Sequence, residues 1–279
     1  MLSREEKNKD LEKEINHEKK VKLSKKIMKI FSLIFISFII IFSYMYFVGT
    51  RFIKTKEYLI KDNIPNSFVG VKILHISDIL YDSVNENDIL SLENEIKLIN
   101  PDIVFFTGNL FNKDYQISNN EIKILNNFMK NIPYKLGKYA VRGNCDNKNF
   151  DLIMDNTDFV ILDNELTTIY NNDNLGIDII GLNGNKTSIN NNNNNYTITL
   201  INNYDLYHDY QISSNLVFSG NNLGGEIKIF NYSLVNNNKY MKDYYKELNT
   251  QVYISNGIGS NNHLRFMNHP SISVYRLYQ

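Results

Sequence analysis

The sequence VKILHISD at residues 71–78 is a run of branched apolar residues that ends on an acidic side chain. A short apolar run of this kind predicts a strand buried on both faces, as in a parallel sheet. Asp78 follows directly after the predicted strand. In open α/β sheets the functional groups collect beyond the carboxyl ends of the strands, so Asp78 is the first candidate site residue.

Two later segments repeat this arrangement. PDIVFFTGN at 101–109 ends at Asn109, and KYAVRGNCD at 138–146 ends in a turn that contains Asn144 and Cys145. Helical patterns at 88–99 and 121–129 separate the three predicted strands. Strands that alternate with helices predict parallel pairing through crossover helices.

The second half of the chain has many short strand patterns and few helical ones. These predict a second sheet that is mostly antiparallel, from strands within 176–182, 196–202, 215–221, 226–232, 251–257 and 271–277. The asparagine tract INNNNNNY at 189–196 is interpreted as a loop expansion without a function of its own.

Residues 30–48, IFSLIFISFIIIFSYMYFV, contain no charged side chain. At ~1.5 Å per residue such a helix is about as long as a bilayer core is thick. A buried helix would rarely be apolar on all sides at this length. A cleaved signal peptide would be followed by small residues, whereas aromatic residues stand at the exit. We therefore expect an uncleaved transmembrane helix.

Lysine-rich sequence precedes this segment, and fewer basic residues follow it. The positive-inside bias predicts a single-pass protein of the cell membrane, with a cytoplasmic amino terminus and an extracytoplasmic domain. The expected organisation is a charged cytoplasmic tail at 1–29, the membrane helix at 30–48, a linker at 49–66 and one domain at 67–279. The tail is predicted to be solvated or a short exposed helix.

The charges of the 279-residue chain balance, with 30 basic and 30 acidic side chains. Nothing in this total favours nucleic acid as a partner, and none is expected. The single cysteine, Cys145, excludes an intramolecular disulfide and a cysteine-cage metal site.

Five separated motifs resemble the calcineurin-like metallophosphoesterase superfamily, in particular its bacterial, membrane-associated phosphodiesterase-type branch. They are Asp78-Ile79-Leu80, Gly108-Asn109, Gly143-Asn144-Cys145-Asp146, Asn202 after a strand, and GNNLGGE at 220–226. The resemblance covers about residues 71–277 and implies an α/β fold, a four-layer α/β/β/α sandwich.

The resemblance also implies which positions would surround a dinuclear metal centre. The first metal would face Asp78, Leu80, Asn109 and Leu223, and the second would face Asn109, Asn144, Asn202 and Asn221. Only Asp78 and Asn144 keep the family's ligand type. Cys145 stands where the family has a histidine near the leaving group.

These replacements remove the chemistry that a dinuclear centre needs. A bridging carboxylate offsets the positive charge of two dications, and the neutral amide of Asn109 cannot do this. Leu80 and Leu223 offer no lone pair, and we expect them to pack together and fill the first metal position. The four asparagines are expected to satisfy one another or to bridge waters. The alternative is a weak oxygen-ligand site for calcium or for a neutral polar ligand.

Other reactive side chains have simpler interpretations. A thiolate nucleophile needs a nearby base or cation, and the motifs contain no histidine, so Cys145 is expected to be a small buried side chain. His75 lies within a predicted strand and is expected to be a core or sheet-surface histidine. His208, near Asp205 and Asp209, is the single weak candidate for a histidine metal site.

The resulting hypothesis is a membrane-anchored pseudoenzyme without a bound cofactor that serves as a binding or interaction module. One alternative is an active metal-dependent phosphoesterase with a remodelled site that uses manganese, iron, zinc or weakly bound calcium. Another is a structural spacer, or a partner subunit for an active paralogue. The membrane is the expected partner of residues 30–48, and a protein partner is expected for the domain.

Overall fold

The computed structural model describes residues 4–185, 189, 195–230, 232–235 and 239–279. The chain divides into two units, residues 1–45 and residues 46–279. Most of the asparagine tract at 189–196 lies outside the described residues.

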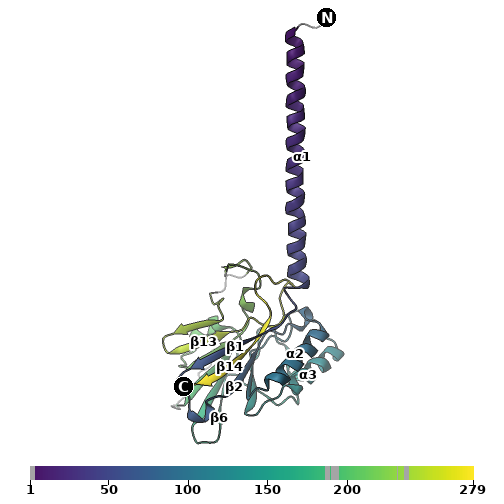
Figure 1. Cartoon of the computed structure of the whole chain (residues 1–279). Coiled ribbons are helices and arrows are strands. Elements are labelled where there is room, and N and C mark those ends of the chain that lie inside the picture. Colours follow the sequence, from purple (N-terminus) through teal and green to yellow (C-terminus); the bar gives the residue numbers. More distant parts are fainter. Residues whose placement is uncertain (1–3, 186–188, 190–194, 231, 236–238) are drawn as a thin grey trace. The chain divides into compact units, whose positions relative to one another are not determined.

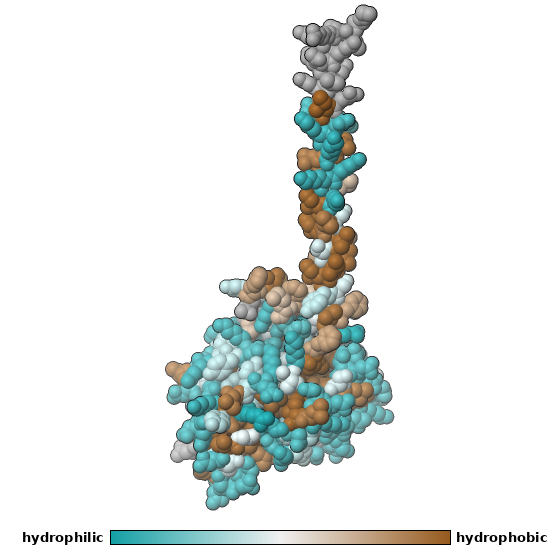
Figure 2. Space-filling view, in the orientation of Figure 1, coloured by the Kyte–Doolittle hydropathy of each residue, from teal (hydrophilic) through white to brown (hydrophobic). Residues whose placement is uncertain are grey.

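The helix α1 (Arg4–Phe47) accounts for nearly all of the first unit and is longer than the expected membrane helix. It also includes most of the predicted charged tail, where the pair Glu18 and Lys22, 3.8 Å apart, is one turn apart on the helix. The part of this helix at residues 15–47 contains a stretch that is apolar and long enough to cross a membrane. Figure 2 shows the change along the helix, from hydrophilic side chains to a continuous hydrophobic surface.

The first sheet of the second unit has the order β1-β14-β2-β3-β4-β5. Its central strands are parallel, as the sequence predicts. The strands are β1 (Lys54–Lys61), β2 (Lys72–Ile76), β3 (Ile103–Phe106), β4 (Gly137–Ala140), β5 (Phe159–Ile161) and β14 (Ser271–Tyr278). The helices α2 (Glu86–Ile99), α3 (Asn119–Asn131) and α4 (Lys148–Met154) pack on this sheet. Figure 1 shows β1, β14 and β2 side by side.

Side-chain caps explain where the first two crossover helices begin. Asn85 accepts a hydrogen bond from the backbone of Asp88 at the start of α2. Ser118 and Glu121 form a capping box at the start of α3. Each cap satisfies amide groups that a helix leaves unpaired at its amino end.

Two expectations about this sheet were wrong. The segment 49–66 is not only a linker, because it contains β1, which pairs in parallel with β14. β1 is an edge strand with mostly exposed or half-buried residues, so it lacks the apolar signal of a buried strand. β14, expected in the second sheet, lies between β1 and β2 in the first.

The second sheet has the order β12-β13-β9-β8-β7-β6, and its expected antiparallel character was also wrong. Its inner pairs are parallel, and only the two outermost pairs are antiparallel. The connections between inner strands therefore cross over, one of them through the short helix η3 (Tyr204–Asp209). The strands are β6 (Glu165–Tyr170), β7 (Gly176–Leu182), β8 (Tyr196–Ile201), β9 (Leu216–Ser219), β12 (Tyr244–Glu247) and β13 (Thr250–Ile254).

A separate hairpin follows β9. The strand expected within 226–232 forms two short strands, β10 (Lys228–Ile229) and β11 (Tyr232–Ser233), which pair only with each other. A 3-10 turn, η4 (Leu223–Gly225), precedes this hairpin.

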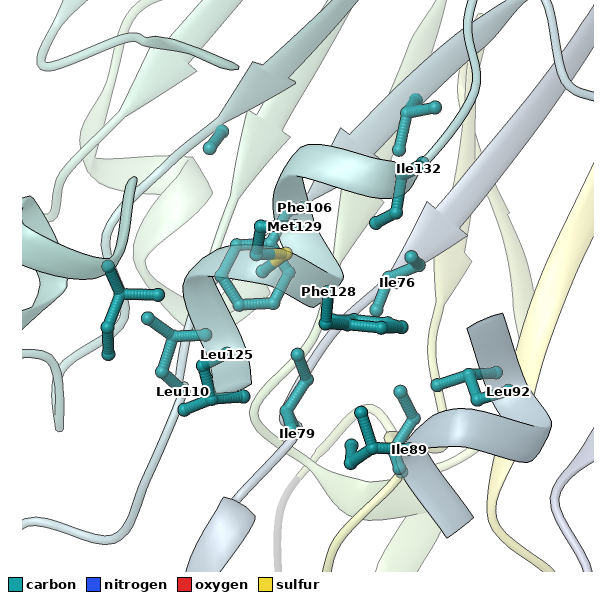
Figure 3. Close-up of a cluster of buried hydrophobic side chains, with 14 of the residues drawn as sticks. Ile76, Ile79, Ile89, Leu92, Phe106, Leu110, Leu125, Phe128, Met129 and Ile132 are labelled. Carbon is teal, nitrogen blue, oxygen red and sulfur yellow. The ribbon is translucent and has the colours of Figure 1, made fainter. Parts of the chain in front are cut away.

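Three apolar clusters hold the layers together. One lies between the first sheet and its helices, where Figure 3 shows Phe128 and Met129 of α3 beside Phe106 of β3. A second joins the two sheets, and a third covers the outer face of the second sheet beneath η3. The expected layered α/β sandwich is confirmed. In the described part of the chain, the outer layer on the second sheet is a 3-10 helix with loops.

Candidate functional site

The carboxyl ends of five strands bring the predicted site loops together. Asp78 follows β2, Asn109 follows β3, Asn144 follows β4, Asn202 follows β8 and Asn221 follows β9. Two of these loops touch through glycines. A Cβ on Gly108 would lie 2.2 Å from the backbone nitrogen of Gly143, so no larger residue fits at this approach.

Asp78 is almost fully buried, with 1% of its surface exposed, at the centre of the site. Its Oδ1 accepts a hydrogen bond from Asn109 Nδ2 at 2.7 Å. Its Oδ2 accepts from Ser77 Oγ at 2.7 Å and from the backbone nitrogen of Asn221 at 2.8 Å. Burial raises the pKa of this carboxyl above its usual range, although the hydrogen bonds act in the opposite direction.

The asparagines expected to form an amide cluster do meet one another or the neighbouring backbone. Asn109 Nδ2 lies 3.4 Å from Asn221 Oδ1, and Asn109 Oδ1 accepts from the backbone nitrogen of Cys145 at 3.1 Å. Asn202 donates to the carbonyl of Thr107 at 2.6 Å and accepts from the backbone of Asn144 at 3.3 Å. The amides of Asn109 and Asn202 therefore each join two loops.

The two leucines at the family's metal positions are both buried, Leu80 at 2% and Leu223 at 1% exposed. Both pack on the same glycine-containing turn. A Cβ on Gly257 would lie 2.7 Å from Leu223 Cδ2, and a Cβ on Gly259 would lie 2.5 Å from Leu80 Cβ. Direct packing of one leucine on the other stays a prediction.

Many of these site residues have left-handed backbone conformations. The φ angle is 47° at Asp78 and 62° at Asn109, and it is 41° at Leu80 and 48° at Leu223. Asparagine tolerates this conformation, whereas leucine adopts it at a cost of about 1–2 kcal/mol. The turns are therefore held by their surroundings, for example by hydrogen bonds from the backbone of Ile258 and Gly259 to the carbonyl of Asp78.

A buried arginine is a central part of the site that the sequence interpretation missed. Arg265 is fully buried, and its guanidinium donates to the carbonyls of Asn256 at 2.8 Å and Leu223 at 3.4 Å, and also to those of Gly259 and Asn268. Burial lowers its pKa to about 10, against the attraction of Glu226 and Asp78. The only sign in the sequence that Arg265 is buried is that apolar residues flank it in a glycine-containing turn.

Asp146, the last residue of the Gly143–Asp146 motif, links two loops. Its carboxylate accepts backbone hydrogen bonds from Gly143 at 2.7 Å, Leu110 at 2.7 Å and Asn109 at 2.8 Å. Desolvation raises its pKa to about 6, although these hydrogen bonds lower it. Asp146 therefore shapes the turn on which Asn109 and Asn144 stand.

The raised pKa of Asp146 predicts a pH dependence of stability. A carboxyl whose folded pKa lies above its unfolded value of about 3.9 favours the fold when protonated. The contribution of Asp146 to stability is therefore complete at pH values below the unfolded pKa. It is lost as the pH rises through the folded pKa of about 6. We expect the Tm of the wild type to fall relative to that of Asp146→Asn between about pH 4 and 7. Parallel Tm profiles of the two proteins would contradict this.

The three reactive side chains His75, His208 and Cys145 lie in different surroundings. His75 is fully buried, bonds Thr107 Oγ1 at 2.9 Å, and has its pKa lowered to about 3 by burial, so it is a core histidine rather than a sheet-surface one. His208 lies 3.0 Å from the hydroxyl of Tyr240 and 3.4 Å from Glu247. Cys145 is half-buried, and burial raises the pKa of its thiol.

A small cavity of about 70 Å³ adjoins the amide cluster, and Leu182, Ile201 and Leu206 give it a largely apolar lining. Its lining includes Arg142, Asn144, Asn183, Asn202 and Asn203. Arg142 forms an ion pair with Asp151, and its guanidinium stacks 4.9 Å from the ring of Phe150. The cavity therefore combines neutral amides with a largely apolar lining.

Two sheets packed face to face, with polar loops gathered at the carboxyl ends of their strands, define an α/β sandwich of the phosphoesterase type. A family model described as calcineurin-like phosphoesterase matches residues 71–261. The chain belongs to this family. No curated protein gives a significant match to it.

The side chains at the positions that the sequence resemblance assigns to metals do not suit a dinuclear centre. Asn109 turns an amide N–H toward Asp78, where a bridging carboxylate would share its oxygens between two cations. Leu80 and Leu223 supply no donor atom. Within the described ranges, no group of three or more His, Cys, Asp or Glu side chains is placed to hold a metal ion.

Proposed function

We propose that this protein is a membrane-anchored pseudoenzyme of the calcineurin-like phosphoesterase family that acts as a binding or interaction module. The observation that carries the proposal is the hydrogen bond from Asn109 Nδ2 to Asp78 Oδ1 at 2.7 Å. It uses a carboxylate oxygen, which would otherwise be free for a cation, to hold two loops together.

The charges around the site support the same proposal. A phosphate ester is attracted and activated by cations placed at its oxygens. Here the carboxylates of Asp78 and Asp146 face the site, while Arg265 is buried among carbonyls and Arg142 is paired with Asp151. Lys113, beside Cys145, is a single further cation. The site therefore lacks the concentrated positive charge that would bind a phosphate.

The groups needed for proton transfer are also unfavourable. Burial, together with the negative charges of Asp146 and Asp78, raises the pKa of the Cys145 thiol. Such a thiol is neither a ready nucleophile nor a good acid at neutral pH. Cys145 therefore does not replace the histidine of active family members.

What remains is a small cavity in which amide groups lie beside apolar side chains. The cavity beside Asn144 and Asn202 presents amide donors and acceptors in a volume of about 70 Å³. This volume admits one small group, such as a side-chain amide or hydroxyl of a protein partner, rather than a whole substrate. We propose a protein partner, with the active paralogue of the family as the first to test.

The membrane part of the proposal is supported by the sequence of α1. The candidate membrane span lies within residues 15–47, and lysines are concentrated before residue 30. By the positive-inside rule, the amino terminus is cytoplasmic and residues 46–279 are extracytoplasmic. The protein would thus present its domain at the outer surface of the cell membrane.

The test is a manganese titration of the full chain in detergent, with Tm and hydrolysis of a generic phosphodiester as readouts. A ligand that binds the folded state raises Tm with its concentration. We expect no rise in Tm and no turnover. Turnover that Asp78→Asn abolishes would overturn the proposal and establish a working metal site. The matched control is Ser77→Ala, which touches the same carboxylate but lies outside the family's metal positions.

A further inference from the structure

We propose that the hairpin β10–β11 inserts apolar side chains into the surface of the bilayer that α1 enters. This inference rests on the membrane anchoring stated under the proposed function. The hairpin patch consists of Ile229, Phe230, Tyr232, Leu234 and Val235. Three of its side chains are strongly exposed, Phe230 at 82%, Tyr232 at 79% and Leu234 at 64%. Soluble surfaces rarely gather such side chains without a binding role.

The backbone beneath the patch is fixed by hydrogen bonds. Leu234 donates from its backbone to the carbonyl of Ile227 at 2.9 Å, and Lys228 donates to that of Phe266 at 2.9 Å. The Ser233 hydroxyl bonds the carbonyl of Gly225 at 2.9 Å. The patch therefore belongs to a hydrogen-bonded hairpin, which keeps its apolar side chains exposed.

The patch lies at the end of the second unit where the chain leaves α1. Lys228 bonds Phe266, and the turn that contains Phe266 starts near His263, which lines a cavity of about 190 Å³ together with Tyr46 and Arg51. The same turn ends near Pro270, whose carbonyl accepts a hydrogen bond from the first residue of β1. Met267 in this turn is 59% exposed and extends the apolar surface.

The bilayer surface is within reach of this end. α1 ends at Phe47 and β1 begins at Lys54, so the connection between them is short. Six extended residues span at most about 20 Å. Residues 46–54 and the hairpin patch both border the 263–270 turn, so the patch stays near the membrane that holds α1.

The chemistry around the patch favours lipid over protein as the occupant. Residues 227–242 contain three lysines, Lys228, Lys239 and Lys242, and no acidic residue. Aromatic and aliphatic side chains flanked by lysines suit the boundary between acyl chains and phosphate head groups. Protein interfaces are instead depleted in lysine.

The experiment labels the full chain at single cysteines with a polarity-sensitive fluorophore, in a Cys145→Ser background. The labelled variants are Phe230→Cys, Leu234→Cys and Leu248→Cys, reconstituted in vesicles of phosphatidylcholine and phosphatidylglycerol. Leu248 is the matched control, because it is 97% exposed in the turn between β12 and β13. Gln251 near this turn bonds the carbonyl of Lys61 at 3.2 Å, which places the turn at the opposite end of β1.

We expect iodide in the buffer to quench labels at 230 and 234 at least about fivefold less than the label at 248, and a lipid-borne quencher to show the reverse order. Equal iodide quenching at all three positions, in chains that float with the vesicles, would overturn the hairpin proposal alone. Chains that do not float with the vesicles would instead overturn the anchoring on which it rests. Protection of 230 and 234 in native membranes but not in pure lipid would overturn the proposal in favour of a protein occupant.

Discussion

Replacement of Arg265 by methionine is expected to lower the free energy of unfolding by about 4 kcal/mol, the largest effect of any substitution considered for this protein. The guanidinium is fully buried and donates to four main-chain carbonyls, including those of Leu223 and Gly259. Methionine has a similar length but no donor, so these carbonyls would lose their partners. It would also leave the carboxylates of Asp78 and Glu226 without a nearby buried cation.

The measurement is chemical denaturation of the purified protein, followed by tyrosine fluorescence. Arg265→Lys is the matched control, because it keeps the charge but cannot reach several carbonyls at once with a planar fork. We expect the lysine variant to lie between the wild type and Arg265→Met. A loss below about 1 kcal/mol for Arg265→Met would mean that the carbonyls find other donors.

Replacement of Asp78 by alanine is expected to lower the free energy of unfolding by about 3 kcal/mol at neutral pH. Three donors meet this carboxylate, from Ser77, Asn109 and the backbone of Asn221, and all would lose their acceptor. In a metal centre, by contrast, a ligand carboxylate serves mainly to bind the cation and contributes little to the stability of the metal-free protein. Its removal would then cost activity and little stability.

Ser77→Ala is the control for this prediction, since it removes only one of the three donors and is expected to cost about 1 kcal/mol. A double-mutant cycle with Arg265→Met then measures the coupling between Asp78 and the buried cation. A positive coupling is expected, because each side chain lowers the cost of burying the other's charge. An unchanged stability of Asp78→Ala would contradict the structural role given to this carboxylate.

The sequence predicted the parts of the fold that have a local signal. The strands before Asp78, Asn109 and Asn144 are buried on both faces, so their apolar runs are continuous and their ends are clear. β1 was missed because an edge strand with exposed alternate residues reads as a polar linker. The direction of the second sheet was missed because short apolar runs do not encode whether neighbouring strands run parallel or antiparallel.

The site was predicted as a set of positions, and its stabilising groups were not. Motif order brought Asp78 and the asparagines together, because the ends of adjacent strands meet at one edge of a sheet. Arg265 escaped notice because a buried cation far along the chain looks the same in sequence as a surface one. The role of Asp146 depends on three backbone amides, which carry no sequence signal.

The left-handed turns at Leu80 and Leu223 have a practical consequence for protein engineering. Both leucines occupy a conformation that their own side chains disfavour, and neighbouring strands and hydrogen bonds fix the main chain there. The main chain of these turns is thus fixed by its surroundings and not by the side chains that it carries. A designer who places imidazole and carboxylate groups on these turns would start from a preshaped main chain and would need to change side chains alone.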